Sequence, residues 1–300
     1  MKKKTYLFAL MAMALTLGSC SDNENGIGGE TSKYITVSTS IGNMTRVATD
    51  EKGGQTFEEG DEISVYAWTG DATVAPETRE RVVNNAINKL TNGSWVSTPQ
   101  MLWKNNRDKH YFIGVYPISA ISDLSAGEYT FDVNKQTESD LLVAVNKDGL
   151  SYNVDEQQPV PLTFTHVMAK LVVNLTYKNQ WGGIPTVEKV VVGNAAKEAT
   201  INYLTKVVTP STTAKEDFSL PEITENTKYV SVIIPQEDVK QLTIVIGGKN
   251  FVYDNGTPFK FESGKITTVN LEVGRDEIKL GDVKITDWEN GSTFSGEALN

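Results

Sequence analysis

The chain has 300 residues, of which 38 are acidic and 28 are Lys or Arg, and its formal net charge at pH 7 is −10. An acidic surface repels phosphate backbones, so nucleic acid is an unfavourable partner. The length suits two domains, and the single cysteine excludes an internal disulfide.

Residues 1–19 have the features of a secretory leader. Three lysines at positions 2–4 precede the uncharged apolar run "TYLFALMAMALTLG". The run has the length of a signal-peptide h-region and is short for a transmembrane helix. The next residues complete the sequence Leu17-Gly18-Ser19-Cys20, which is similar to the bacterial lipobox. This similarity implies that Cys20 becomes the mature N-terminus and carries lipid that anchors the chain to a membrane.

Residues 20–32 are acidic and Gly-rich, which favours a solvated tether. They also resemble the export signal that directs lipoproteins to the surface of Bacteroidota cells. Removal of residues 1–19 takes away three lysines and no acidic residue, so the mature chain carries a net charge of −13.

The remaining sequence predicts an all-β protein. Short runs rich in Val, Ile, Thr, Tyr and Phe recur between turn-forming residues. We expect strands at 33–41, 61–68, 109–117, 128–133, 140–145, 160–164, 169–177, 187–193, 228–235, 242–246, 249–254 and 266–273. Regularly spaced strands of this kind are typical of β-sandwiches.

Four short segments predict hairpin turns because their residues adopt positive φ angles readily. They are Asn92-Gly93, Asp148-Gly149, Gly247-Gly248 and Asp254-Asn255-Gly256.

The segment "ETRERVVNNAINKL" (77–90) allows two interpretations. Its apolar residues Val82, Val83, Ala86, Ile87 and Leu90 share one helical face. However, its three asparagines are poor helix formers, and a hairpin signal follows directly. We therefore expect a strand.

A domain boundary is expected close to the segment "QQPVPLTF". Pro159 and Pro161 should interrupt regular strand pairing there, and a strong strand follows at Lys170. We therefore predict an N-terminal sandwich domain at 33–165, a C-terminal sandwich domain at 166–288 and a tail at 289–300.

The sequence offers no case for catalysis, and it predicts neither a cofactor nor a metal site. The two histidines lie in separate segments; we expect His110 at a solvated strand start and His166 in a structural hydrogen bond. Four carboxylates crowd positions 58–62, where a solvated turn is a better interpretation than a glycosidase pair. No Gly-rich phosphate loop precedes a helix, and no EF-hand spacing occurs.

The tryptophans leave a second function open. Each could stack on a sugar, although packing is the commoner role of this residue: Trp68, Trp95, Trp103, Trp181 and Trp288. The alternative function is therefore a non-polymerising surface lipoprotein that binds glycan or a host protein.

The order and spacing of several motifs resemble the fimbrillin family, the subunits and accessory proteins of Bacteroidota type V pili. The motifs are the lipobox at Cys20, "TFEEGDEISVYAW" (56–68), "YFIGVYP" (111–117), "LTFTHVMAKLVVNL" (162–175), "GKITTVNLEV" (264–273) and "VKITDWENG" (283–291). The resemblance implies two tandem transthyretin-like β-sandwich domains. It also implies a lipid-anchored precursor at the outer membrane, then a cell-surface fimbrium that supports adhesion and is built with other pilin subunits.

The family mechanism is polymerisation by strand exchange, in which a trypsin-like protease cuts after an arginine and removes the first strand. In this sequence the resemblance places the cut between Arg46 and Val47. The removable strand would be "KYITVSTSI", with Ile35, Val37 and Ile41 on one face as groove-filling residues. The open groove would accept the C-terminal strand of another subunit.

The candidate donor strand is "EIKLGDVKITDW" (277–288). Ile278 and Leu280 share one face, and Val283 and Ile285 join a common face only if Gly281-Asp282 inserts a bulge or turn. Tip subunits of the family tend to lack such a donor, so its presence favours a stalk subunit. The polar tail at 289–300 departs from an ideal groove-filling segment.

Overall fold

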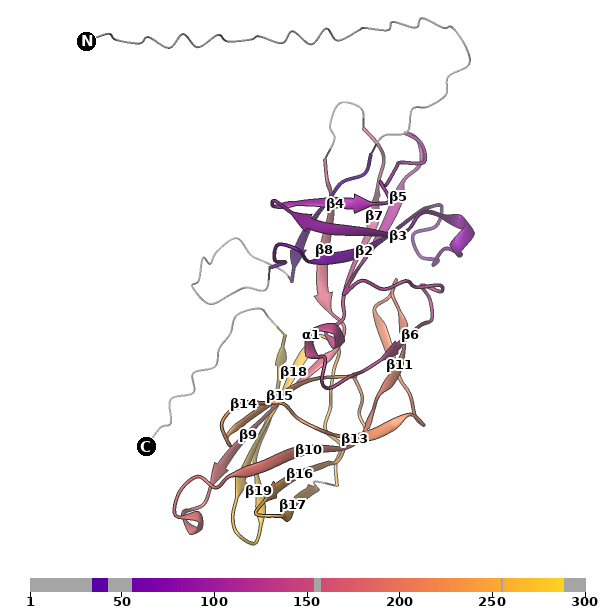
Figure 1. The fold of residues 1–300 in the computed structure, drawn as a ribbon. Coiled ribbons are helices and arrows are strands. Elements are labelled where there is room, and N and C mark those ends of the chain that lie inside the picture. Colours follow the sequence, from indigo (N-terminus) through magenta and orange to yellow (C-terminus); the bar gives the residue numbers. More distant parts are fainter. Residues whose placement is uncertain (1–33, 43–55, 154–157, 255, 289–300) are drawn as a thin grey trace, which may run out of the picture. The chain divides into compact units, whose positions relative to one another are not determined.

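The computed structural model describes residues 34–42, 56–153, 158–254 and 256–288, and these are almost entirely β (Figure 1). The all-β prediction is therefore confirmed. The helical elements are short: η1 (Thr78–Glu80), α1 (Gln136–Ser139) and η2 (Asn179–Trp181). None of the described helices is long and apolar enough to cross a membrane.

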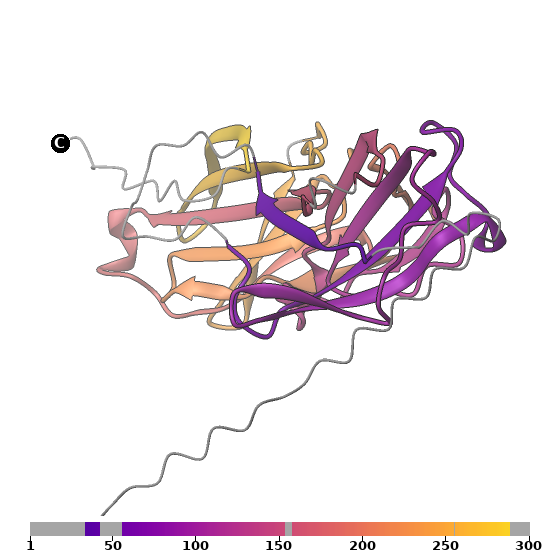
Figure 2. The ribbon, with the colours of Figure 1, turned by 90° about the horizontal axis from the view of Figure 1, so that it is seen from above.

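Seven strands of the N-terminal half form one sheet in the order β1-β8-β7-β5-β2-β3-β4. Their bounds are β1 (Val37–Ile41), β2 (Glu62–Thr69), β3 (Arg81–Thr91), β4 (Ser94–Thr98), β5 (His110–Tyr116), β7 (Leu142–Leu150) and β8 (Val160–His166). Figures 1 and 2 draw β1 in indigo, at the edge of this sheet.

The other strands form three sheets, in the orders β13-β10-β16-β17, β12-β11-β6 and β14-β15-β9-β18-β19. Their bounds are β6 (Gly127–Thr130), β9 (Ala169–Tyr177), β10 (Val187–Ala196), β11 (Glu198–Asn202), β12 (Val207–Pro210), β13 (Lys215–Ser219), β14 (Glu222–Thr224), β15 (Lys228–Ile233), β16 (Gln241–Ile246), β17 (Lys249–Asp254), β18 (Lys265–Val273) and β19 (Ile278–Asp287).

The ambiguous segment at 77–90 forms strand β3, which pairs with β2 and β4. Asn85 explains the misleading helical spacing. It has a φ of +54° beside a register shift in the β2–β3 ladder, so an irregularity moves the apolar pattern by one residue. Its side chain accepts a hydrogen bond from the hydroxyl of Tyr66 at 3.2 Å.

Two of the predicted hairpins are confirmed. Asn92 and Gly93 join β3 to β4 with φ angles of +51° and +73°, and Gly247 and Gly248 join β16 to β17 with +60° and +72°. Positive φ at both positions is the requirement of a type I′ turn. The turn predicted at 254–256 includes residue 255, which lies outside the described residues.

Two local predictions are wrong. Asp148-Gly149 makes no hairpin but lies inside β7, where the register with β5 shifts and Gly149 has a φ of +71°. A bulge uses positive φ as readily as a turn does. Pro161 does not interrupt pairing but stands in β8 opposite Ser38. Among the residues of β8, only Phe164 to His166 pair with β7. Pro161 lies before that ladder, so the N–H that proline lacks is not needed for a hydrogen bond to β7.

The core has two clusters on opposite faces of the seven-stranded sheet. One includes Ile63, Val65 and Phe112 and belongs to the N-terminal half. The other includes Tyr66 and Ile113 of the same strands and continues through the sheets of the C-terminal half. Burial on both faces explains the continuous apolar run of β2.

Strands up to His166 belong to the seven-stranded sheet, and strands from Ala169 onward belong to the other three sheets. The exception is β6, which precedes His166 but pairs with β11. The division into tandem sandwich domains at 33–165 and 166–288 stays a prediction.

Candidate functional site

Strand β1 is held along one edge by a ladder of hydrogen bonds. It runs parallel to β8, from Val37 opposite Val160 to Ile41 opposite Phe164. At the two ends of the ladder, the Val160 N–H donates to the Thr36 carbonyl and the Gly42 N–H donates to the Phe164 carbonyl, each at 2.8 Å. The register is therefore fixed from end to end.

The inward face of β1 fills part of the N-terminal core, as the alternation predicts. Ile35, Val37 and Ile41 are 1%, 6% and 6% exposed and belong to the same cluster as Leu162 and Phe164 of β8. Burial of three such side chains contributes on the order of 5–9 kcal/mol relative to full exposure. The N-terminal core depends on this strand.

Two contacts reach β1 and the residues that lead into it from the other side. The Ile35 N–H donates to the Met101 carbonyl at 2.9 Å, and the Trp95 indole N–H donates to Thr39 Oγ1 at 3.0 Å. Between β1 and the β3–β4 hairpin lies a cleft of about 640 Å³, which Phe57 and Trp95 also line. A strand at the edge of its sheet, with a ladder to one neighbouring strand, is the arrangement that strand replacement needs.

The candidate donor strand β19 lies at the edge of the five-stranded sheet, antiparallel to β18. The register shifts between Val283 and Leu280, so a bulge at Gly281-Asp282 meets the condition for a shared face. Ile278 and Leu280 are half-buried against the core. Val283 and Ile285 are 38% and 40% exposed.

His166 makes the structural hydrogen bond that the sequence predicts. Its Nδ1 lies 2.8 Å from Asp140 Oδ1. The prediction for His110 is half wrong, since it starts β5 but is fully buried. The Lys104 N–H bonds its Nε2 at 3.0 Å and the Trp103 ring packs edge-on at 4.9 Å, so the preceding loop covers it. This burial lowers the pKa of His110.

Three predicted site residues cannot be placed. Cys20, Arg46 and Val47 lie outside the described residues, so lipidation and processing there stay predictions.

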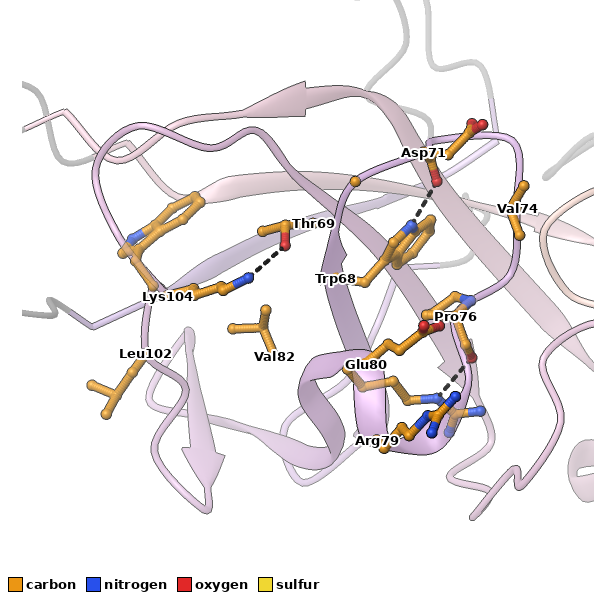
Figure 3. A pocket seen from close by; sticks show the side chains of 13 residues that line it. Trp68, Thr69, Asp71, Val74, Pro76, Arg79, Glu80, Val82, Leu102 and Lys104 are labelled. Atoms are coloured by element: carbon orange, nitrogen blue, oxygen red, sulfur yellow. Dashed lines mark hydrogen bonds between the residues drawn. The ribbon is translucent and has the colours of Figure 1, made fainter.

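A concavity of about 780 Å³ lies beside β2 and η1 (Figure 3). Trp68 lines it but is 2% exposed, and its indole N–H donates to the Asp71 carbonyl at 2.9 Å. The Lys104 ammonium donates to Thr69 Oγ1 at 3.2 Å. The indole face is therefore covered, and the concavity offers no aromatic platform for a sugar.

The other tryptophans are also engaged in packing. Trp103 contacts Phe112, Trp95 contacts Phe57, and Trp181 donates to the Val273 carbonyl at 2.9 Å. The contacts of Trp288 are with His166 and Lys170. None of the five indoles is exposed, which favours packing over glycan binding.

The carboxylates at 58–62 form a turn that ties strands together. Asp61 accepts from the Glu58 N–H at 2.7 Å, Glu59 accepts from the Asn92 N–H at 2.7 Å, and Glu62 pairs with Lys89 at 2.9 Å. Within the described residues, no group of three or more His, Cys, Asp or Glu could hold a metal ion.

The sequence profile of the fimbrillin-like family matches residues 45–288. A protein of Bacteroides uniformis named as a fimbrium subunit, Fim1C, is 25% identical over 322 aligned positions, which cover 99% of this chain and 100% of that protein.

Two crystal structures, each described as a candidate cell adhesion protein, share the fold. One, from Bacteroides uniformis, has a TM-score of 0.61 and 18% identity and covers 85% of this chain and 99% of its own. The other, from Bacteroides ovatus, has a TM-score of 0.63 and 17% identity and covers 87% of this chain and 100% of its own.

Proposed function

We propose, because this chain belongs to the fimbrillin-like family, that it is a structural subunit of a surface fimbria that supports cell adhesion. The role is structural and assigns no reaction to the chain. Its partners are other pilin subunits, and a host protein or glycan is the target to which the assembled fibre adheres.

The precursor is a lipoprotein held at the outer membrane by lipid on Cys20. A protease cuts between Arg46 and Val47, which separates the rest of the chain from the anchor and from β1. The subunit then joins a fimbrium at the cell surface. The trimmed chain carries a net charge of −12, since residues 20–46 hold three acids and two bases.

The observation that carries this proposal is the place of β1. β1 supplies Val37 and Ile41 to the core, and Ile35 joins them from the residues that lead into it, yet the backbone ladder of β1 joins β8 alone among the described strands. Loss of β1 would leave an apolar groove and an unpaired β8 edge, and both are costly in water. A strand from another subunit would satisfy both at once.

The candidate donor has the matching pattern. Ile278, Leu280, Val283 and Ile285 are apolar, and Lys279 and Lys284 between them are exposed. In the donor these residues pair with β18 of their own subunit, so donation exchanges one ladder for another. A stalk subunit needs both the groove and the donor.

Limited proteolysis of the purified chain, residues 20–300, tests the proposal. An arginine-specific protease should convert the wild-type monomer into a ladder of polymers on unheated gels, while Arg46→Ala should stay monomeric under the same treatment. Trimmed wild-type chain that remains a folded monomer at high concentration would contradict strand exchange.

A further inference from the structure

The C-terminal strand β19 is held unevenly. Before the bulge, Ile278 and Leu280 pack against the core. After it, the side chains of Val283 and Ile285 are exposed. Lys284 and Asp287 are exposed as well, and Thr286 is half-buried. The distal half therefore has a backbone ladder to β18 but little apolar burial to stabilise it.

Trp288 follows this weakly buried half directly. Its ring stacks on the His166 ring with centroids 3.9 Å apart and an interplanar angle of 7°. The Lys170 ammonium lies over the Trp288 ring, 5.2 Å from its centroid. The backbone N–H of Trp288 donates to the Gly264 carbonyl at 2.9 Å. Trp288 is thus the principal apolar anchor at this end of the strand.

His166 is a fixed platform for that ring. It is 7% exposed, it ends β8, and Asp140 holds its Nδ1 at 2.8 Å. Opposite it in the ladder stands Leu142 of β7. The platform therefore belongs to the same strand that pairs with β1.

We propose that Trp288 and His166 form an intramolecular latch, which holds the distal half of β19 on its own subunit until assembly. Trp288 must leave His166 before residues 283–287 can separate from β18. The inference rests on the proposed function only for the role of the released strand, because the latch itself is a property of the single subunit.

Hydrogen–deuterium exchange of the uncleaved monomer, residues 20–300, tests the latch. In Trp288→Ala, amides of residues 283–287 should exchange roughly tenfold faster than in the wild type, which is the scale of one aromatic stacking contact with its buried area. Trp288→Phe keeps a smaller stacked ring and should give an intermediate rate. Amides of β10 and β16 should keep their wild-type rates.

Trp95→Ala is the matched control, because it removes another half-buried tryptophan, whose contacts are with Phe57 and Thr39. It should leave exchange at 283–287 unchanged. His166→Phe retains a flat ring and should hold the strand better than His166→Ala does.

Unchanged exchange at 283–287 in Trp288→Ala would overturn the latch. Equal acceleration in β10 and β16 would overturn it as well, since Trp288 would then stabilise the whole subunit. Fast exchange at 283–287 alone supports the latch even if the trimmed chain never polymerises, an outcome that would count against the proposed function only.

Discussion

Thr39 in β1 accepts a hydrogen bond from the indole N–H of Trp95 in β4, with 3.0 Å between Oγ1 and Nε1. β1 and β4 stand at opposite ends of the strand order in the seven-stranded sheet. The contact therefore joins the two edges of that sheet. It makes β1 the closing element of the N-terminal core, held by its ladder to β8 and by this contact with β4.

Thr39→Val should lower the free energy of unfolding by about 1–2 kcal/mol, because the Trp95 N–H would lose its partner in a half-buried position. Denaturant unfolding of the uncleaved chain measures this loss. Thr39→Ser keeps the hydroxyl and is the matched control. Equal losses in the two variants would show that the hydrogen bond contributes nothing.

Ile35→Ala should lower the free energy of unfolding of the uncleaved chain by about 2–5 kcal/mol, the range for truncating a large side chain in a packed core. Ile35 is 1% exposed and packs in the cluster that β1 completes. Thr36→Ala, on the exposed face of the same segment, should change stability by less than about 0.5 kcal/mol. A comparable loss in both variants would mean that the segment leading into β1 does not turn one face to the core.

Gly114→Ala should destabilise the uncleaved chain by about 1–3 kcal/mol through overpacking. A Cβ at this position of β5 would lie 2.7 Å from Cζ of Phe164, whose ring fills the core beside β1. Thermal unfolding of Gly114→Ala, of Phe164→Leu and of the double variant measures the effect. The double variant should lose less stability than the sum of the two single losses, and a purely additive result would refute the steric explanation.

Alkaline pH should destabilise the chain through Tyr203. Burial raises the pKa of Tyr203 to about 12, whereas an unfolded tyrosine has a pKa of about 10. Between these values the unfolded state has lost a proton that the folded state keeps, so the free energy of unfolding falls as pH rises.

Tyr203→Phe removes this titrating group, so the free energy of unfolding should fall less steeply with pH. The slope should decrease by up to about 1.4 kcal/mol per pH unit, which corresponds to one proton. Denaturant unfolding in a pH series from neutral to strongly alkaline measures the slope. Identical slopes in wild type and Tyr203→Phe would contradict the assignment.

Local sequence patterns predicted much of the fold because the information lies within a few residues. Strict alternation in residues 35–41 identified the buried face of β1, and Asn92-Gly93 identified a hairpin by its backbone conformation. The apolar spacing of β19 showed that a shared face would need a bulge or turn at Gly281-Asp282, and the structure has a register shift there. Strands β11 to β14 were missed because they are short and carry charged or polar residues such as Lys215 and Glu216.

Features that depend on distant segments could not be predicted. The residues that neighbour His110 in the sequence do not indicate that the loop before it folds over the imidazole ring. The parallel pairings of β1 with β8 and of β9 with β18 join segments far apart in the sequence, as do the Thr39–Trp95 and His166–Trp288 contacts. The alternating pattern predicted a strand at 33–41, but it could not indicate which distant residues contact that strand.

The most direct test of the central claim is the mass and N-terminal sequence of the subunit recovered from the cell surface. The account predicts a chain that begins at Val47 and has lost the lipid on Cys20 together with β1. A lipid-modified chain that begins at Cys20, with no shorter form, would contradict removal of the first strand and leave a permanently tethered protein.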